Sequence, residues 1–121
     1  MKSLKVLIVD DEPHARNLLE ILVKSYCREI LFARNGSESI DICKKINDID
    51  LIFMDKKMPE TDGYEATRQI RLFNKDVIII ALSASHEESE KDHAIIAGSN
   101  GFLYKPVDID MLTTLIASFF K

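Results

Sequence analysis

The chain has 121 residues, of which 46% are hydrophobic and 30% charged. This length suits one domain, spanning residues 1–121, that buries a single core without disulfides or structural metals. The net charge of −4 argues against direct binding to nucleic acid, which needs clustered lysines and arginines. No apolar run approaches the ~20 residues of a membrane span, and the first apolar stretch is too short for a signal peptide. We therefore expect a cytoplasmic protein with no membrane insertion.

Short apolar runs alternate with helical patterns along the whole chain. Runs typical of buried strands are found at 5–9, 29–33, 50–54, 77–82 and 101–104. Apolar residues at helical spacing predict a first helix that begins near Pro13 and places Leu18, Leu19, Leu22 and Tyr26 inward. Further helices are predicted at 37–46, at 63–73 with Phe73 inward, at 86–98, and through 111–120 with Asp108 or Asp110 as its cap. The alternation predicts an α/β fold built of βαβ units around a parallel sheet.

Two cysteines, Cys27 and Cys43, are too few and too far apart for a zinc site or a disulfide framework. Each falls in a predicted helix, where a cysteine commonly serves as a small buried apolar group. We expect neither to carry chemistry.

Three acids, Asp10, Asp11 and Asp55, come directly after two of the predicted strands. Open α/β sheets bind ligands beyond the carboxyl ends of their strands, so the three carboxylates would meet at one edge. Like charges that close are costly unless a cation joins them, which favours a site for Mg²⁺. The alternative is an acidic loop in which Asp11 or Glu12 caps the following helix. Asp55 could also be a cap, but Asp62 fits that role better.

Two more strand ends carry polar groups, with Ser83-Ala84 after the fourth strand and Lys105-Pro106 after the fifth. An X-Pro bond is the kind that adopts a cis conformation. Metal, ammonium and hydroxyl could hold the three oxygens of a phosphoryl group while Asp55 attacks it. The alternatives are a local turn closed by the Ser83 hydroxyl and a solvated Lys105.

Four segments of the chain, LIVDDE, MDKKMPETDG, IIALSAS and GFLYKP, together resemble the receiver domains of two-component response regulators. The resemblance extends from Lys5 to the end of the last helix. It implies a flavodoxin-like (βα)5 three-layer sandwich with a parallel sheet of order 2-1-3-4-5. That order would put the first and third strands side by side.

The resemblance also implies how the site works. Asp55 would accept a phosphoryl group from a sensor histidine kinase or a histidine phosphotransfer protein, in a reaction that depends on Mg²⁺. The metal would be held by Asp10, Asp11, Asp55 and the main-chain carbonyl of Lys57.

A conformational switch is implied as well, through Ser83 and the aromatic position held by Phe102. Their movement would remodel the face made by the fourth helix, fifth strand and fifth helix, through which a phosphorylation-dependent dimer could form. The alternative for Phe102 is an ordinary core aromatic. The effector or linked domain that responds is unknown.

Lys57 is the main departure from the family pattern, because its cation would lie near the phosphoryl group. We expect Lys57 to screen the acyl phosphate from water and prolong its lifetime; the alternative is a surface lysine paired with Glu60. Ala84 would leave the site open to a partner. The chain stops after SFFK, either as a stand-alone receiver, which Met1 slightly favours, or as a segment of a longer regulator or hybrid kinase.

Other functions fit less well. A Mg²⁺-dependent small-molecule phosphatase or phosphotransferase with an aspartate nucleophile would generally need a cap or a further acid–base group. A flavin or nucleotide module would need glycines in the first turn, which reads DDEPH. A receiver-like docking module would not need the full set of site residues. We therefore expect a signalling phosphoacceptor rather than an enzyme acting on separate substrates.

Overall fold

The computed structural model describes residues 3–58, 62–85 and 87–120. Within these residues the chain alternates strand and helix from one end to the other. The strands are β1 (Leu4–Val9), β2 (Cys27–Ala33), β3 (Leu51–Asp55), β4 (Ile78–Ser83) and β5 (Gly101–Tyr104). The helices are α1 (Pro13–Val23), α2 (Gly36–Lys45), α3 (Gly63–Arg71), α4 (Glu88–Ala97) and α5 (Ile109–Phe119), with a 3-10 turn η1 (Lys24–Tyr26) after α1.

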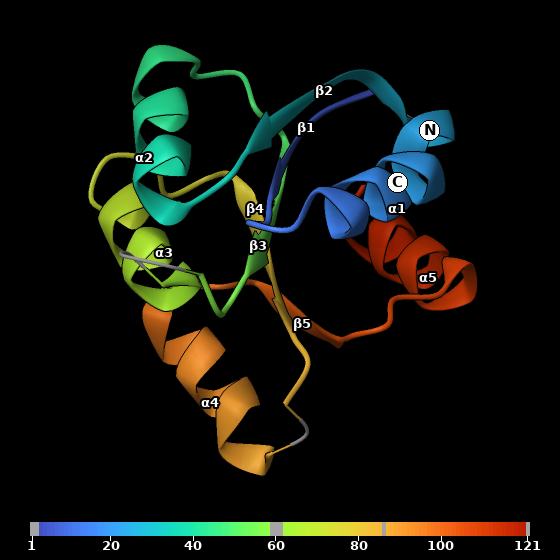
Figure 1. Ribbon diagram of the computed structural model, residues 1–121. Helices are drawn as coiled ribbons and strands as arrows, with labels where there is room; N and C mark the ends of the chain where they lie inside the picture. Colours follow the sequence, from blue (N-terminus) through green and yellow to red (C-terminus); the bar gives the residue numbers. More distant parts are fainter. Residues whose placement is uncertain (1–2, 59–61, 86, 121) are drawn as a thin grey trace.

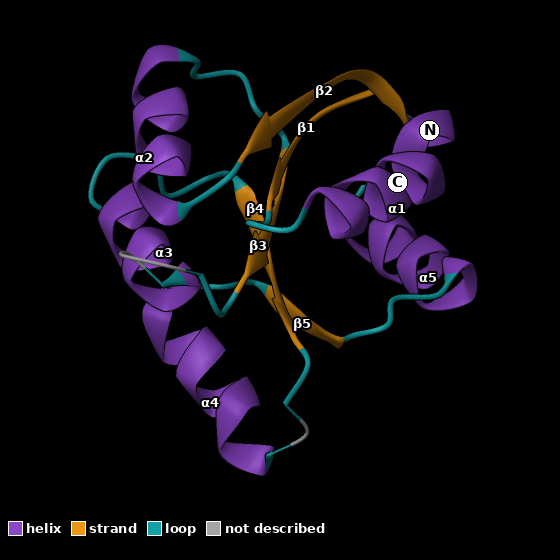
Figure 2. Ribbon diagram, in the orientation of Figure 1, coloured by secondary structure: helices purple, strands orange, loops and turns teal. Residues whose placement is uncertain are grey.

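The sheet is parallel throughout, with the strand order β2-β1-β3-β4-β5. Helices α1 and α5 cover one face of the sheet, whereas α2, α3 and α4 lie on the other (Figure 1). Figure 2 shows the resulting three layers, with the strands between two groups of helices. The predicted flavodoxin-like fold and strand order are confirmed.

The core follows from the alternation of side chains along each strand. In β1, Val6 and Ile8 pack toward α1 and α5, whereas Leu7 and Val9 pack toward α2 and α3. Because both faces are covered, β3 is buried along its whole length, including Asp55 at its end. A charged residue in that position must find partners above the sheet edge.

Helix ends follow local sequence signals. The side chain of Asn35 accepts a bond from Glu38 N at 2.8 Å at the start of α2, and Asp62 does the same for Glu65 N at the start of α3. Asp108, rather than Asp110, caps α5 by accepting from Met111 N at 2.8 Å. These caps satisfy backbone donors that the first helical turn leaves unpaired.

Several predicted details are wrong. Cys27 lies in β2 rather than in a helix and is only half-buried, whereas Cys43 is buried in α2 as predicted. Leu18 is 45% exposed because the inward stripe of α1 runs through Leu19 and Val23. Phe73 is 43% exposed because α3 ends at Arg71, before the predicted helix does.

Tyr26 follows α1 in the separate turn η1 and packs against the core as a half-buried side chain. Its hydroxyl lies 2.9 Å from the Thr113 hydroxyl of α5. The prediction that Tyr26 faces inward holds, although the residue lies outside the helix that it was expected to extend.

Candidate functional site

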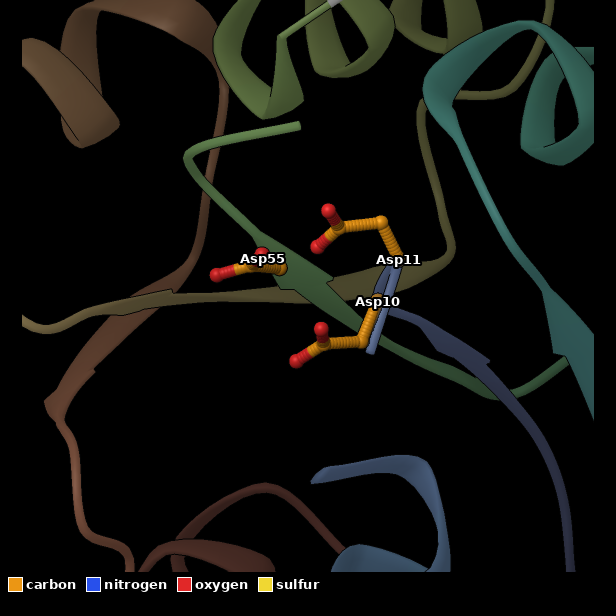
Figure 3. A group of neighbouring side chains, drawn as sticks. All are labelled: Asp10, Asp11 and Asp55. Carbon is orange, nitrogen blue, oxygen red and sulfur yellow. The ribbon is translucent and has the colours of Figure 1, made fainter. Parts of the chain in front are cut away.

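Three carboxylates gather at the carboxyl edge of β1 and β3. In the sheet register Val9 lies opposite Met54, so the residues that follow, Asp10 and Asp55, come side by side. One oxygen from each of Asp10, Asp11 and Asp55 can be chosen so that all three lie within 4.8 Å of one another (Figure 3). Asp10 and Asp55 are buried and Asp11 is exposed. This is an oxygen donor set of the kind that Mg²⁺ prefers.

Lys105 joins the two buried acids. Its ammonium lies 2.8 Å from Asp10 Oδ2 and 3.0 Å from Asp55 Oδ1, and the Lys105-Pro106 bond is cis. Burial disfavours the charged lysine, but its hydrogen bond to Asp10 and its attraction to Asp55 outweigh that cost and raise the Lys105 pKa. The alternative of a solvated Lys105 is therefore wrong. One cation offsets only part of the charge of three carboxylates.

The surroundings of Asp55 disfavour its charged form. Burial and the neighbouring charge of Asp10 raise the pKa of Asp55 to about 6, against the opposing attraction of Lys105. A carboxylate held this way is destabilised as an anion, so a cation bound beside Asp55 relieves that cost.

A cavity of about 450 Å³ opens above this group. Its lining contains the predicted site residues Asp10, Asp11, Asp55, Lys57, Ser83, Ala84 and Lys105, together with Glu12, Lys56 and Ser85. Residues from four segments far apart in the sequence thus face one space, which is large enough for a phosphoryl group and a hydrated cation.

Ser83 is buried at the end of β4, and its hydroxyl accepts a hydrogen bond from Ser85 N at 3.0 Å. The predicted alternative, a local turn, is therefore present. The hydroxyl hydrogen is not used by that bond and can still be donated to a group in the cavity. Ala84 is exposed at the mouth.

The capping alternative for the first acidic segment is not supported. Glu12 occupies the N-cap of α1 but makes no side-chain capping bond. Instead, Asp10 Oδ1 accepts from Glu12 N at 3.0 Å, and the Arg16 side chain donates to the Asp10 carbonyl oxygen at 2.7 Å. These bonds orient Asp10 toward the cavity. Arg16 was not predicted, because a bond to a backbone carbonyl leaves no motif.

Phe102 is not part of the cavity lining. It is half-buried on β5, against a small cluster formed by Tyr64, Ala81, Ala94 and Ala97, and its ring meets Tyr104 edge-on at 4.9 Å between centroids. Phe102 is thus a partly buried aromatic that packs against side chains of α3, β4 and α4.

Gly63 has a close-packing role at the start of α3, where its sequence predicts a turn held against the edge of the sheet. A Cβ at this position would lie 2.1 Å from the carbonyl oxygen of Asp55, and Gly63 N donates to the Lys56 carbonyl oxygen at 2.8 Å. Only glycine allows α3 to begin so close to the end of β3. The DG pair in the MDKKMPETDG segment was the available signal.

A partly buried ion pair next to the site was also not predicted. Lys56 Nζ pairs with a carboxylate oxygen of Glu90, which is buried in the first turn of α4. The signal was present in the sequence, since Glu90, Ala94 and Ala97 recur at helical spacing and all three face inward.

The arrangement defines a class of protein, an α/β domain with an acidic, lysine-containing site at the switch point of its sheet. Residues 6–117 match the model of the response regulator receiver domain family, and the chain belongs to that family.

Individual relatives agree. The chain is 35% identical to the two-component response regulator ARR22 of Arabidopsis thaliana, over 98% of this chain and 85% of the relative. The receiver domain of Saccharomyces cerevisiae Ssk1, solved with the histidine phosphotransfer protein Ypd1, is 33% identical with a TM-score of 0.89, covering 98% of this chain and 89% of that one. The receiver domain of sensor kinase PA1611 from Pseudomonas aeruginosa, solved with magnesium in its active-site cleft, is 28% identical with a TM-score of 0.86 and 97% coverage of each chain.

Relatives differ greatly in length. The chain spans only 12% of the Salmonella typhimurium sensor histidine kinase RcsC, to which it is 30% identical.

The family match and the site together identify the protein as a receiver domain of two-component signalling. Its acidic residues fit the magnesium-binding phosphoacceptor site of such domains. Among the described residues, no helix has the length and apolar character needed to span a membrane.

Proposed function

We propose that Asp55 accepts a phosphoryl group from a phosphohistidine on a sensor kinase or phosphotransfer protein. The observation that carries this proposal is the buried Asp55 carboxylate, grouped with Asp10 and Asp11 and held 3.0 Å from the Lys105 ammonium. In the reaction a P–O bond forms to an Asp55 oxygen and the P–N bond to the donor imidazole breaks. The imidazole nitrogen keeps the electron pair and serves as the leaving group.

The remaining residues have distinct roles in this proposal. Asp10, Asp11, Asp55 and the main-chain carbonyl of Lys57 would hold Mg²⁺, which supplies positive charge to the phosphoryl oxygens. Lys105 pairs with a phosphoryl oxygen and the Ser83 hydroxyl donates to another. Both groups already line the cavity, so little rearrangement is needed to meet the phosphoryl group.

An apolar groove beside the acids supports the choice of partner. It has a volume of about 360 Å³ and lies between α1 and the segment after β5, with Leu18, Leu22, Pro106 and Val107 in its lining. Lys105 borders both this groove and the acidic cavity. A helix that carries a phosphohistidine could bury apolar residues here while its imidazole reaches Asp55. Ypd1, the partner in the Ssk1 structure, is a histidine phosphotransfer protein.

The product is a signal rather than a released chemical. Movement of Ser83 toward the phosphoryl group would let Phe102 turn further inward. That turn would remodel the α4–β5–α5 face, where a phosphorylation-dependent dimer or an effector could bind.

We place this single domain, residues 1–121, in the cytoplasm. Its chemistry is limited to its own phosphorylation and dephosphorylation.

Lys57 and Ala84 would tune the lifetime of the phosphorylated state. Lys57 is exposed on the cavity lining, so its cation can screen the acyl phosphate, while Ala84 keeps the mouth open for a partner. The alternative partner of Lys57, Glu60, lies outside the described residues.

Intact mass after incubation with Mg²⁺ and a small phosphodonor tests the proposal. Wild type should gain one phosphoryl group, and Asp55→Asn should gain none. An unmodified wild type would count against the proposal. Continuous phosphate release from a small ester would instead favour the phosphatase alternative.

A further inference from the structure

Lys56, the residue directly after the phosphoacceptor, ties β3 to α4. Its ammonium pairs with one carboxylate oxygen of Glu90, and the residue also borders the acidic cavity. Its backbone is fixed at both ends, since Lys56 N donates to the Leu82 carbonyl at 2.9 Å and its carbonyl accepts from Gly63 N at 2.8 Å. The backbone of Lys56 is therefore anchored, and any movement of its ammonium must come from rotation of its long side chain.

Glu90 depends on this pairing. Its side chain is 6% exposed, and its second carboxylate oxygen accepts a hydrogen bond from the Tyr64 hydroxyl at 2.8 Å. A buried carboxylate that loses its cation is left with an uncompensated charge, which is strongly unfavourable. If Lys56 turns away, the first turn of α4 has a reason to move so that Glu90 reaches water.

Apart from Glu90, helix α4 buries only small side chains. It faces the core with the small side chains of Ala94 and Ala97, which bury little apolar area. In contrast, the loop after α4 is clamped by Arg71 of α3, whose guanidinium donates to the Gly98 carbonyl at 2.9 Å and to Asn100 Oδ1 at 2.7 Å. Figure 1 shows α4 extending past α3. Both Tyr64, which bonds to Glu90, and Arg71, which bonds to the loop after α4, belong to α3. The helix thus has one firmly held end and one end held through an ion pair.

We propose that the Lys56–Glu90 pair, supported by Tyr64, is a latch that holds α4 in its resting position and opens when Asp55 is phosphorylated. This proposal rests on the phosphoacceptor function proposed above. Phosphorylation replaces a carboxylate by a group with nearly two negative charges on the residue next to Lys56. That charge competes with Glu90 for the Lys56 ammonium. Glu90 then loses its partner, and the first turn of α4 is released while the Arg71 end stays fixed.

The latch connects the site to Phe102. Tyr64 belongs to the cluster against which Phe102 packs, so movement of Tyr64 with Glu90 changes the space available to that ring. Two inputs, Ser83 and Lys56, would then act on the same helix. A population shift requires only that the phosphorylated site favour the released state of α4.

The test measures how tightly the protein binds beryllofluoride with Mg²⁺, a mimic of the acyl phosphate. A latch that must open on loading stabilises the protein without beryllofluoride. Glu90→Gln removes the ion pair that forms the latch, so it should tighten beryllofluoride binding about tenfold. Tyr64→Phe, which keeps the ion pair, should tighten it less. The matched control Glu88→Gln, an exposed acid in the same helical turn, should leave binding unchanged. Unchanged or weaker binding by a folded Glu90→Gln protein would overturn the latch.

Hydrogen exchange on wild type provides a measurement that needs no variant. On loading, amides in the first two turns of α4 should exchange about tenfold faster, while those near Gly98 should not. Equal exchange before and after loading would overturn the latch yet leave the phosphoacceptor function intact. A wild type that binds no beryllofluoride and gains no phosphoryl mass would overturn both.

Discussion

Neutralising the phosphoacceptor should stabilise the metal-free protein. In Asp55→Asn an amide replaces a carboxylate whose pKa is raised from 3.8 to about 6 by burial and by the charge of Asp10. At about 1.4 kcal/mol per unit, the charged form costs roughly 3 kcal/mol relative to the unfolded chain. The cavity is open to water, which screens part of this cost, so we expect a gain of about 2 kcal/mol near pH 7.5.

The sign of the pH dependence follows from the raised pKa. Between the unfolded value of 3.8 and the folded value of about 6, native wild type binds more protons at Asp55 than the unfolded chain does. The stability of wild type relative to Asp55→Asn is therefore greatest below about pH 4 and falls as the pH rises through about 6. The two proteins should be nearly equally stable in acid and should diverge toward neutral pH.

Urea unfolding in EDTA, followed by far-ultraviolet circular dichroism because the chain has no tryptophan, measures this difference. Asp41→Asn, at an exposed position on α2, is the control and should change stability by less than about 0.5 kcal/mol. Saturating Mg²⁺ should reverse the order, because it stabilises wild type more than a variant that lacks one ligand. If Asp55→Asn is no more stable than wild type near pH 7.5 in EDTA, Lys105 fully compensates the buried charge and the reasoning is refuted.

Three further predictions follow from the geometry. Lys57→Ala should speed hydrolysis of the phosphorylated protein about fivefold, because one partly screened positive charge is lost. Lys75→Ala, at an exposed position, is the control and should leave the hydrolysis rate unchanged. Equal rates of phosphate loss from wild type and Lys57→Ala would refute the screening role. Asp10→Asn should weaken Mg²⁺ binding at least about tenfold, because it removes a buried carboxylate that is a proposed metal ligand and the partner of Lys105. Titration calorimetry measures this change, and an affinity equal to that of wild type would exclude Asp10 as a ligand. Arg71→Ala should cost about 2 kcal/mol in urea unfolding because it removes charged hydrogen bonds to the Gly98 loop, while Arg68→Ala on the exposed face of α3 should cost less than about 0.5 kcal/mol.

Local patterns predict most of the fold. Alternating apolar runs and helical spacing locate every strand in the described part of the chain within one or two residues, since covered parallel strands are apolar throughout. The errors fall where tertiary contacts override local signals. Cys27 fits a helical spacing but pairs in the sheet opposite Leu4, and Phe73 continues a stripe that ends with α3. Residues at the ends of elements are the hardest to assign from sequence.

Local sequence patterns predict a shared edge for Asp10, Asp11, Asp55, Ser83 and Lys105, because each lies at the carboxyl end of a strand and parallel strands end together. How these groups interact depends on tertiary packing. Packing brings Lys105, which lies 95 residues after Asp10 in the chain, into contact with both Asp10 and Asp55. It also buries Asp55, so that the pKa of Asp55 rises, and pairs Lys56 with Glu90 of α4. The physical reason is that periodicity records which face a residue occupies, whereas electrostatic coupling depends on distance and burial, which are set when distant segments pack.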